Sequence, residues 1–331
     1  MTGMTSPSHA PTVFVETAAR IHFGVLDLRR TTGRWFGGIG AAAPAPTLLV
    51  SACAADTLDV EGDDASRAAD FARRFLVHHD IRRGARLRAH RALPAHAGLG
   101  SGTQLALAVA RALAEPYDVD ADSLELANVT GRACRSAIGT WTFAGGGLVV
   151  EGGRLPGSGR CGPLLTRLPF PESWRCVVAV PDGVRGASGV DEVEAFAHLP
   201  PPPERDVERV SHLVLMALLP ALVEADLRTF GSALTTIQAM TGRWFAPVQG
   251  GTFAPGPSEH LVRRMTEWGA SGVGQSSWGP AVYGIVDGEV AGSQLAERVR
   301  AALGAAGTVH EGPFRAEGAR VWHAHVHAET T

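Results

Sequence analysis

A glycine-rich segment with two hydroxyl residues is the part of the sequence whose residue types and spacing most directly suggest chemistry. It reads Gly98-Leu99-Gly100-Ser101-Gly102-Thr103, and an apolar pattern typical of a helix follows at once. Backbone N–H groups in such a turn can all point at one anion, because no Cβ blocks the approach, and the helix dipole adds to the attraction. The segment predicts a phosphate-binding loop to which His96, the two hydroxyls and Gln104 contribute. A tight strand-to-helix turn without a ligand is the alternative.

This loop differs from two common nucleotide-binding motifs. It lacks the lysine of G-x-x-x-x-G-K-[ST], and its glycines do not follow G-x-G-x-x-G with an acid downstream. All 30 basic residues are arginine, so no lysine can act as a phosphate clamp, a Schiff base or a general base.

The elements that position the loop follow from hydrophobic periodicity. Strands are predicted over 12–28, 33–52 after a glycine turn, 85–93, 145–153, 174–181, 272–288 after a turn, and 319–327, and helices over 64–79, 103–114, 123–135, 206–224, 226–241 and 291–304. A stretch dense in glycine and proline follows 153 and marks a boundary. We therefore expect an α+β protein with an N-terminal domain over 11–168 and a C-terminal domain over 169–328.

Composition limits the classes of function. The net charge of −3 gives no electrostatic argument for nucleic acid or an anionic membrane. The four widely spaced cysteines indicate reduced thiols in a cytoplasmic protein, and the first ten residues show no signal-peptide pattern. The longest apolar run, 213–223, contains Pro220 and is too short to span a bilayer, so it predicts a buried helix that serves a core or a dimer contact.

Two motifs resemble those of the GHMP kinase superfamily. The segment PAHAGLGSGTQLALAVA is similar to the second motif, Pro-x-x-x-Gly-Leu-Gly-Ser-Ser-Ala, which wraps the triphosphate of ATP in those kinases, and GVGQSSWGPAVYGIV is similar to the third. The resemblance implies a two-domain fold with a ribosomal-protein-S5-like N-terminal domain and a ferredoxin-like C-terminal domain. Gly139 stands where the kinases carry a catalytic aspartate. Without that acid and without lysine, the loop is expected to hold phosphate without phosphorylating anything.

One branch of the superfamily fits more of the chain. The segments ARIHFGVLDL, GRWFGGIG, GLGSGTQLALAVA, GRACRSAIG, HLVLMALLPALVEADLRTFG and GQSSWGPAVYG resemble the β-ribofuranosylaminobenzene 5′-phosphate synthases, from about Arg20 to Gly284. The resemblance implies a phosphoribosyltransferase that joins phosphoribosyl pyrophosphate to 4-aminobenzoate or 4-hydroxybenzoate and releases CO2 and pyrophosphate. That reaction opens the pathway to tetrahydromethanopterin. Mg²⁺, no organic cofactor, small-molecule substrates and a homodimer are expected with it.

The implied reaction requires a carboxylate near the ribosyl centre and cations around the phosphates. Asp27, at the end of a strand, is the first candidate for the carboxylate and Glu192 the second; either is also the candidate Mg²⁺ ligand. A turn cap for Asp27 and a solvated acid at a helix start for Glu192 are the alternatives. Arg20 and Arg132 are candidates to bind phosphate or the benzoate carboxylate, as is Arg135.

Further candidate substrate-binding residues come from the segments that carry the resemblance: His22, Gly37, Gly38, Ser136, Gln275, Ser276 and Ser277. Trp278 or Trp35 is a candidate to stack on the aromatic acceptor. His323, His325 and His327 alternate along a predicted strand and share one face, which suggests a metal site or an incidental exposed face. An ATP-dependent small-molecule kinase and a non-catalytic ligand-binding protein remain the alternative functions.

Overall fold

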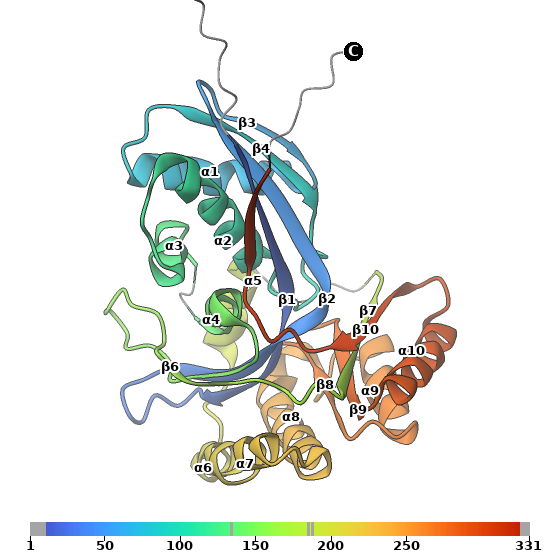
Figure 1. Cartoon of the computed structure of the whole chain (residues 1–331). Helices are drawn as coiled ribbons and strands as arrows, with labels where there is room; N and C mark the ends of the chain where they lie inside the picture. The colour runs from blue at the N-terminus through green and yellow to red at the C-terminus, as the bar shows by residue number, and fades with distance from the viewer. Residues whose placement is uncertain (1–10, 133–134, 184–185, 187–188, 325–331) are drawn as a thin grey trace, which may run out of the picture.

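The computed structural model describes residues 11–132, 135–183, 186 and 189–324 (Figure 1). Its first sheet contains β1 (Thr12–Asp27), β2 (Phe36–Ala55), β3 (Asp59–Gly62), β4 (Gly84–Arg91), β5 (Leu148–Glu151), β6 (Leu164–Leu168) and β11 (Arg320–Ala324). The strands follow the order β11-β1-β2-β4-β3, and β5 pairs with the first part of β2 and with β6. The long strand β2 thus serves two parts of the sheet, with β5 near one end and β4 near the other.

Four helices belong to the N-terminal half: α1 (Ala65–His78), α2 (Ser101–Ala114), α3 (Ser123–Val129) and α4 (Ile138–Gly145). Side chains of β1 alternate between buried and half-buried from Thr12 to Arg20, as a strand with one covered face requires, and the next five residues are all buried. The central helix α2 is alanine- and leucine-rich and almost entirely buried. It therefore carries the glycine-rich loop on a rigid element.

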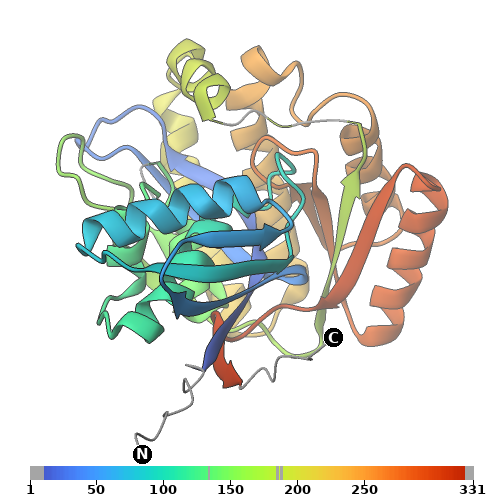
Figure 2. The same cartoon turned by 90° about the horizontal axis from the view of Figure 1, so that it is seen from above.

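The second sheet has the order β10 (Gly307–Pro313), β7 (Trp174–Pro181), β9 (Val282–Asp287) and β8 (Gly272–Gln275). Strand β7 alternates between two cores: Val178 and Val180 join the large core, whereas Val177 and Ala179 join a smaller one with α9 (Pro257–Glu267) and α10 (Glu289–Leu303). Helix α8 (Leu227–Gln249) belongs to the large core. Seen from above, α1 and α10 lie at opposite sides of the molecule (Figure 2).

The remaining helices are α5 (Gly189–His198), α6 (Glu204–Leu213) and α7 (Leu219–Val223), with a short 3-10 turn at Glu115–Tyr117. A π-helical segment, Val214–Leu218, joins α6 to α7. Leu215, Met216 and Val223 are exposed there, so the helix predicted to be buried has an outward apolar face. Among the described residues, no helix combines the length and apolarity needed to cross a bilayer.

Most predicted elements are present, and the differences have local causes. The helix predicted over 123–135 ends at Val129 and begins with Asp122, whose carboxylate accepts from the N–H groups of Leu124 and Glu125. The predicted final strand is β11, and His325 and His327 lie outside the described residues. Because β11 pairs with β1, the last described strand belongs to the first sheet. The domain boundary at 168/169 stays a prediction.

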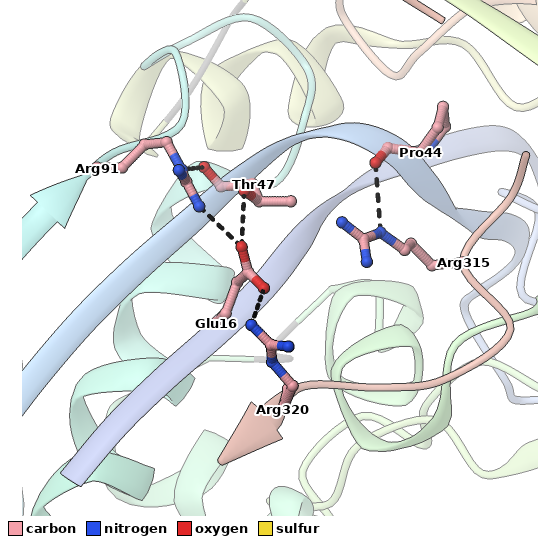
Figure 3. A network of polar contacts seen from close by, with 6 residues as sticks. All are labelled: Glu16, Pro44, Thr47, Arg91, Arg315 and Arg320. Atoms are coloured by element: carbon pink, nitrogen blue, oxygen red, sulfur yellow. Dashed lines mark hydrogen bonds and ion pairs between the residues drawn. The ribbon is translucent and has the colours of Figure 1, made fainter. Parts of the chain in front are cut away.

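The return of β11 is reinforced by Glu16 on β1 (Figure 3). Its carboxylate accepts from Arg91 at 2.8 Å, from Arg320 at 3.2 Å and from the Thr47 hydroxyl at 3.3 Å. One carboxylate thus connects β1 with β2, β11 and the end of β4.

Replacing Glu16 with glutamine is expected to lower the free energy of unfolding by about 1 kcal/mol, because two charge-assisted bonds are lost at a half-exposed site. Urea denaturation measures it. Asp70→Asn is the control, since the Asp70–Arg73 pair is 62% exposed on both sides and is expected to contribute almost nothing. Equal losses in the two variants would contradict the connecting role of Glu16.

Candidate active site

A cavity of about 330 Å³ lies where the two halves of the protein meet. Its walls come from β1, the start of β2, α2, α5, α8 and the turn after β8. Eleven of the predicted site residues line it: Arg20, His22, Gly37, Thr103, Arg132, Arg135, Ser136, Glu192, Gln275, Ser277 and Trp278. The fold therefore brings together segments that are far apart in the sequence.

The glycine-rich loop leads into α2 beside the cavity, and of the residues 98–103 only Thr103 lines it. Gly100 is the N-cap residue, with φ 76°, and the cap carries no side-chain hydrogen bond. Gly98, with φ 77°, passes so close to the third motif that an added Cβ would overlap the carbonyl oxygen of Ser276. The Ser276 hydroxyl donates to the Gly98 carbonyl at 2.7 Å and accepts the backbone N–H of His22 at 2.9 Å. The loop can approach Ser276 this closely because Gly98 has no side chain.

Three arginines make one end of the cavity cationic. Arg20 donates to the Gly98 carbonyl, and Arg132 reaches the Thr103 hydroxyl at 3.3 Å. Burial lowers the pKa of Arg20 to about 10; Glu192 opposes this fall and the charge of Arg132 adds to it. Arg135 pairs with Glu192 at 2.5 Å. Arg20 keeps its charge at neutral pH, so this end attracts an anion.

His22 lies beside this cluster and is 7% exposed. Burial, and then the charge of Arg20, lower the pKa of its imidazole to about 3. Its Nε2 lies 3.4 Å from the Ser136 hydroxyl. His22 is therefore neutral at physiological pH and serves as a hydrogen-bonding group rather than as a cationic acid.

Another part of the lining is aromatic. Phe196 meets Phe36, Trp278 and Phe245 edge-on at centroid distances of 5.1, 5.6 and 5.9 Å, and Phe245 meets Trp278 at 4.8 Å. All four rings line the cavity. The cavity thus joins an anion-binding end to a surface suited to a flat apolar ring.

Comparisons with known proteins identify the family of the chain. Residues 65–145 match the family model of the GHMP kinases N terminal domain, and residues 218–305 match that of the GHMP kinases C terminal domain. The β-ribofuranosylphenol 5′-phosphate synthase of Methanothermobacter thermautotrophicus is 36% identical over 305 residues, covering 85% of this chain and 92% of that protein. The synthase of the same name from Archaeoglobus fulgidus is 36% identical over 295 residues, covering 86% and 91%.

The chain belongs to the β-ribofuranosylphenol 5′-phosphate synthase family. It is therefore an enzyme of the pentosyltransferase type. Homoserine kinase from Cytophaga hutchinsonii superposes with a TM-score of 0.65 at 16% identity, covering 97% of this chain and all of that one. Mevalonate pyrophosphate decarboxylase from Streptococcus pyogenes gives 0.66 at 13% identity, covering 94% and 99%. The predicted α+β GHMP-kinase-like fold is confirmed.

Several predicted site residues of this synthase-family protein lie behind the cavity wall. Gln104 is fully buried; its amide accepts from Thr17 at 2.7 Å and donates to the Gly139 carbonyl at 2.9 Å. The structure thus uses Gln104 to hold α2 in place. Gly98, Gly100, Ser101, Gly102 and Ser276 shape the loop without lining the cavity, and Gly38 lies beneath the His22 ring. The backbone carbonyl of His96 accepts the N–H of Gly186.

Asp27 is not brought to the cavity. Its Oδ1 accepts the backbone N–H of Arg29 at 2.5 Å and that of Arg30 at 3.3 Å, which caps the turn after β1. Glu192 lines the cavity instead. Within the described ranges, no group of three or more histidine, cysteine, aspartate or glutamate side chains is arranged to hold a metal. Glu192 is the cavity carboxylate that would bind a Mg²⁺ ion whose other ligands are substrate phosphates, in exchange for its ion pair with Arg135.

Sequence reasoning missed Glu151, at the end of β5. Its carboxylate is fully buried, accepts the N–H of Gly153 at 2.8 Å and lies 3.5 Å from the N–H of Ala137, the N-cap of α4. Burial raises its pKa to about 7, although both backbone contacts act in the opposite direction. Glu151 holds the segment that presents Ser136 to the cavity. A buried acid ending an apolar strand is the one signal in the sequence that indicates it.

Because the pKa of Glu151 rises on folding, the folded state keeps a proton that the unfolded state has released between about pH 4.5 and 7. Its contribution to stability is thus fully present below this window and falls as the pH rises through it. Glu151→Gln has no such proton to lose. The free energy of unfolding of the variant minus that of wild type is therefore expected to rise by about 3 kcal/mol between pH 4.5 and 8. Urea titrations across that range measure it. Parallel curves for the two proteins would contradict it.

Proposed function

We propose that the protein transfers the phosphoribosyl group of phosphoribosyl pyrophosphate to 4-hydroxybenzoate or 4-aminobenzoate, with release of CO2 and pyrophosphate. The observation that carries the proposal is that one cavity is lined both by arginine and hydroxyl side chains and by a group of aromatic rings. The first suits a phosphorylated sugar and the second a benzoate ring. The family relatives are named for a ribofuranosylphenol phosphate, which is the product expected from the hydroxy acceptor.

The donor is bound by the cationic end. Arg20 and Arg132 supply N–H donors to phosphate oxygens, and Thr103 and Ser136 add hydroxyls. His22, which is neutral, donates one further hydrogen bond to a phosphate oxygen but adds no positive charge. Mg²⁺ supplies further charge neutralisation to the pyrophosphate when bound, with Glu192 as its protein ligand. No organic cofactor is needed, because the ring itself supplies the electrons.

The bond changes balance without an oxidant. The C1–O bond of the ribosyl group breaks, pyrophosphate leaves with the electron pair, and the ring carbon that bears the carboxylate bonds to C1. The carbon–carboxylate bond then breaks, CO2 leaves, and its electron pair restores the aromatic ring.

An ATP-dependent kinase is the alternative, and the structure gives it little support. A Cβ added at Gly139 would lie 3.0 Å from the Thr103 Cγ2, so the aspartate that kinases carry there would require the Thr103 side chain to shift by a few tenths of an ångström. The Gly139 carbonyl is also held by Gln104.

Purified protein with phosphoribosyl pyrophosphate, either acceptor and Mg²⁺ is expected to yield a C-ribosylated 5′-phosphate, identified by mass spectrometry, together with pyrophosphate. A parallel reaction with ATP and small alcohols tests for ADP. Formation of ADP without the ribosylated product would favour the kinase. The proposal extends to a cytoplasmic homodimer that acts on small molecules in tetrahydromethanopterin synthesis.

A further inference from the structure

Two hydroxyl groups of the cavity lining are not used by the protein itself. They belong to Thr252, in the loop after α8 that we call the cavity loop (residues 250–256), and to Ser277, in the turn after β8. Within the described part of the chain, neither hydroxyl forms a hydrogen bond. The other hydroxyls of the lining each contact a protein group: those of Thr103, Ser136 and Thr241. The two unused hydroxyls are therefore available to a substrate.

Ser277 lies where the two parts of the lining meet. The residue before it, Ser276, bonds to the Gly98 carbonyl at 2.7 Å and to the backbone N–H of His22 at 2.9 Å, beside the cationic end. The residue after it, Trp278, belongs to the group of aromatic rings. Because its two neighbours in the chain contact different parts of the lining, Ser277 stands at their junction.

The amide of Gln275 holds Thr252 at the same junction. Gln275 is buried, its Oε1 accepts the backbone N–H of Ala254 at 2.6 Å, and its Nε2 donates to the Ser277 carbonyl at 3.0 Å. On the other side of the cavity loop, a Cβ added at Gly242 of α8 would lie 2.2 Å from the Thr252 carbonyl oxygen. The cavity loop is thus packed on α8 and connected by one amide to the turn that carries Ser277.

Two further glutamines complete this support. Gln249 Nε2 donates to the Thr252 carbonyl at 2.9 Å, and Gln249 Oε1 accepts from Gln275 Nε2 at 3.2 Å. Gln238 Oε1 accepts the backbone N–H of Gln275 at 2.9 Å, and its Nε2 donates to the Phe23 carbonyl at 2.6 Å. An amide that uses both its oxygen and its nitrogen in this way has a fixed orientation. The three glutamines therefore position protein groups, and the hydroxyls are left to the substrate.

We propose that the hydroxyls of Ser277 and Thr252 bind the two neighbouring hydroxyl groups of the donor's ribose, and that Gln275 is the positioning residue that sets their separation. The inference rests on the proposed function and gives the ribose its place in the cavity. With the phosphates at the cationic end and the acceptor on the aromatic rings, C1 reacts between them, so the ribose lies at the junction. A side-chain hydroxyl both donates and accepts, which matches a sugar hydroxyl in either direction.

Isothermal titration calorimetry with ribose 5-phosphate and 2-deoxyribose 5-phosphate tests the pairing without turnover. Wild type is expected to bind ribose 5-phosphate about tenfold more tightly, because a site that bonds a ligand hydroxyl disfavours the ligand that lacks it. In the double variant Ser277→Ala, Thr252→Val, this preference is expected to fall below about twofold. Ser293→Ala, an exposed change on α10, is the control and is expected to keep the wild-type preference.

The outcomes separate the inference from the proposed function. A preference that persists in the folded double variant would overturn the inference. So would wild type that forms the ribosylated product but shows no preference between the two sugar phosphates, and the proposed function would then stand. Wild type that forms no ribosylated product from either acceptor would overturn both.

Gln275→Glu tests the positioning role by itself. The carboxylate still accepts the N–H of Ala254 but cannot donate to the Ser277 carbonyl. The KM for phosphoribosyl pyrophosphate is expected to rise about tenfold, while the KM for the acceptor changes by less than about twofold, a split that general loss of structure would not give. Gln294→Glu, exposed on α10, is the control. An unchanged KM for the donor in Gln275→Glu would exclude Gln275 from this role.

Discussion

Replacing Arg20 with glutamine is expected to lower kcat/KM for phosphoribosyl pyrophosphate by about two orders of magnitude. Arg20 lines the cavity at the cationic end and interacts electrostatically with both Arg132 and Glu192. Burial lowers the pKa of its guanidinium to about 10, which shows that the buried charge is destabilised by loss of water. An anionic substrate is expected to offset this destabilisation. Steady-state kinetics with varied donor measure the loss.

Two further variants test whether the loss is specific to the guanidinium of Arg20. Arg86→Gln, an exposed substitution on β4, is expected to leave kcat/KM unchanged. Arg20→Lys keeps the charge but not the two-pronged geometry, and is expected to recover only part of the activity. Wild-type kcat/KM in a folded Arg20→Gln protein would remove Arg20 from donor binding.

Gly98→Ala is expected to lower the free energy of unfolding by about 3 kcal/mol and activity by at least two orders of magnitude. The residue has φ 77°, and a methyl group there would overlap the Ser276 carbonyl. Relief of that overlap requires the loop to move away from the third motif. This movement breaks the bond from Ser276 to Gly98 and displaces Arg20, which donates to the same carbonyl.

Gly157 offers a matched control because its φ is 76° and no atom lies within 4 Å of an added Cβ. Gly157→Ala therefore carries the backbone strain without the overlap, and its cost is expected to be about 1 kcal/mol. Thermal and urea denaturation of both variants, with activity assays, measure the difference. Equal effects in the two variants would show that the close approach at Gly98 contributes nothing.

Local pattern was sufficient for much of the fold and for part of the site. The glycines from 98 to 102 predict a turn into a helix, and the structure has that turn, with Thr103 just after it in the cavity wall. Arg20, His22 and Arg132 were identified through segments that resemble one family, and they do meet. The aromatic wall was not predictable in this way, since Phe196 and Phe245 come from α5 and α8 and meet Phe36 only through tertiary packing. Of that wall, only Trp278 was identified.

The two candidate carboxylates also show that residue type alone does not decide which side chain lines the cavity. Asp27 and Glu192 are equally acidic in the sequence, yet the hydrogen bonds of the turn after β1 hold Asp27 and leave Glu192 to the cavity. Gln104 follows the glycine-rich loop but lies on the buried side of α2, where its amide bonds to the Thr17 hydroxyl and the Gly139 carbonyl. Which face of a helix a residue occupies, and which groups lie within hydrogen-bond distance of it, decide these roles. Residue type alone does not give either.

The most direct measurement uses 4-hydroxybenzoate labelled in the carboxyl group in one sample and in the ring in another, each with phosphoribosyl pyrophosphate and Mg²⁺. The proposed reaction predicts one labelled CO2 for each ribosylated, ring-labelled product, with no CO2 when the ribosyl donor is omitted. Ribosylated product that retains the carboxyl label, or the absence of both labelled CO2 and product, would contradict it.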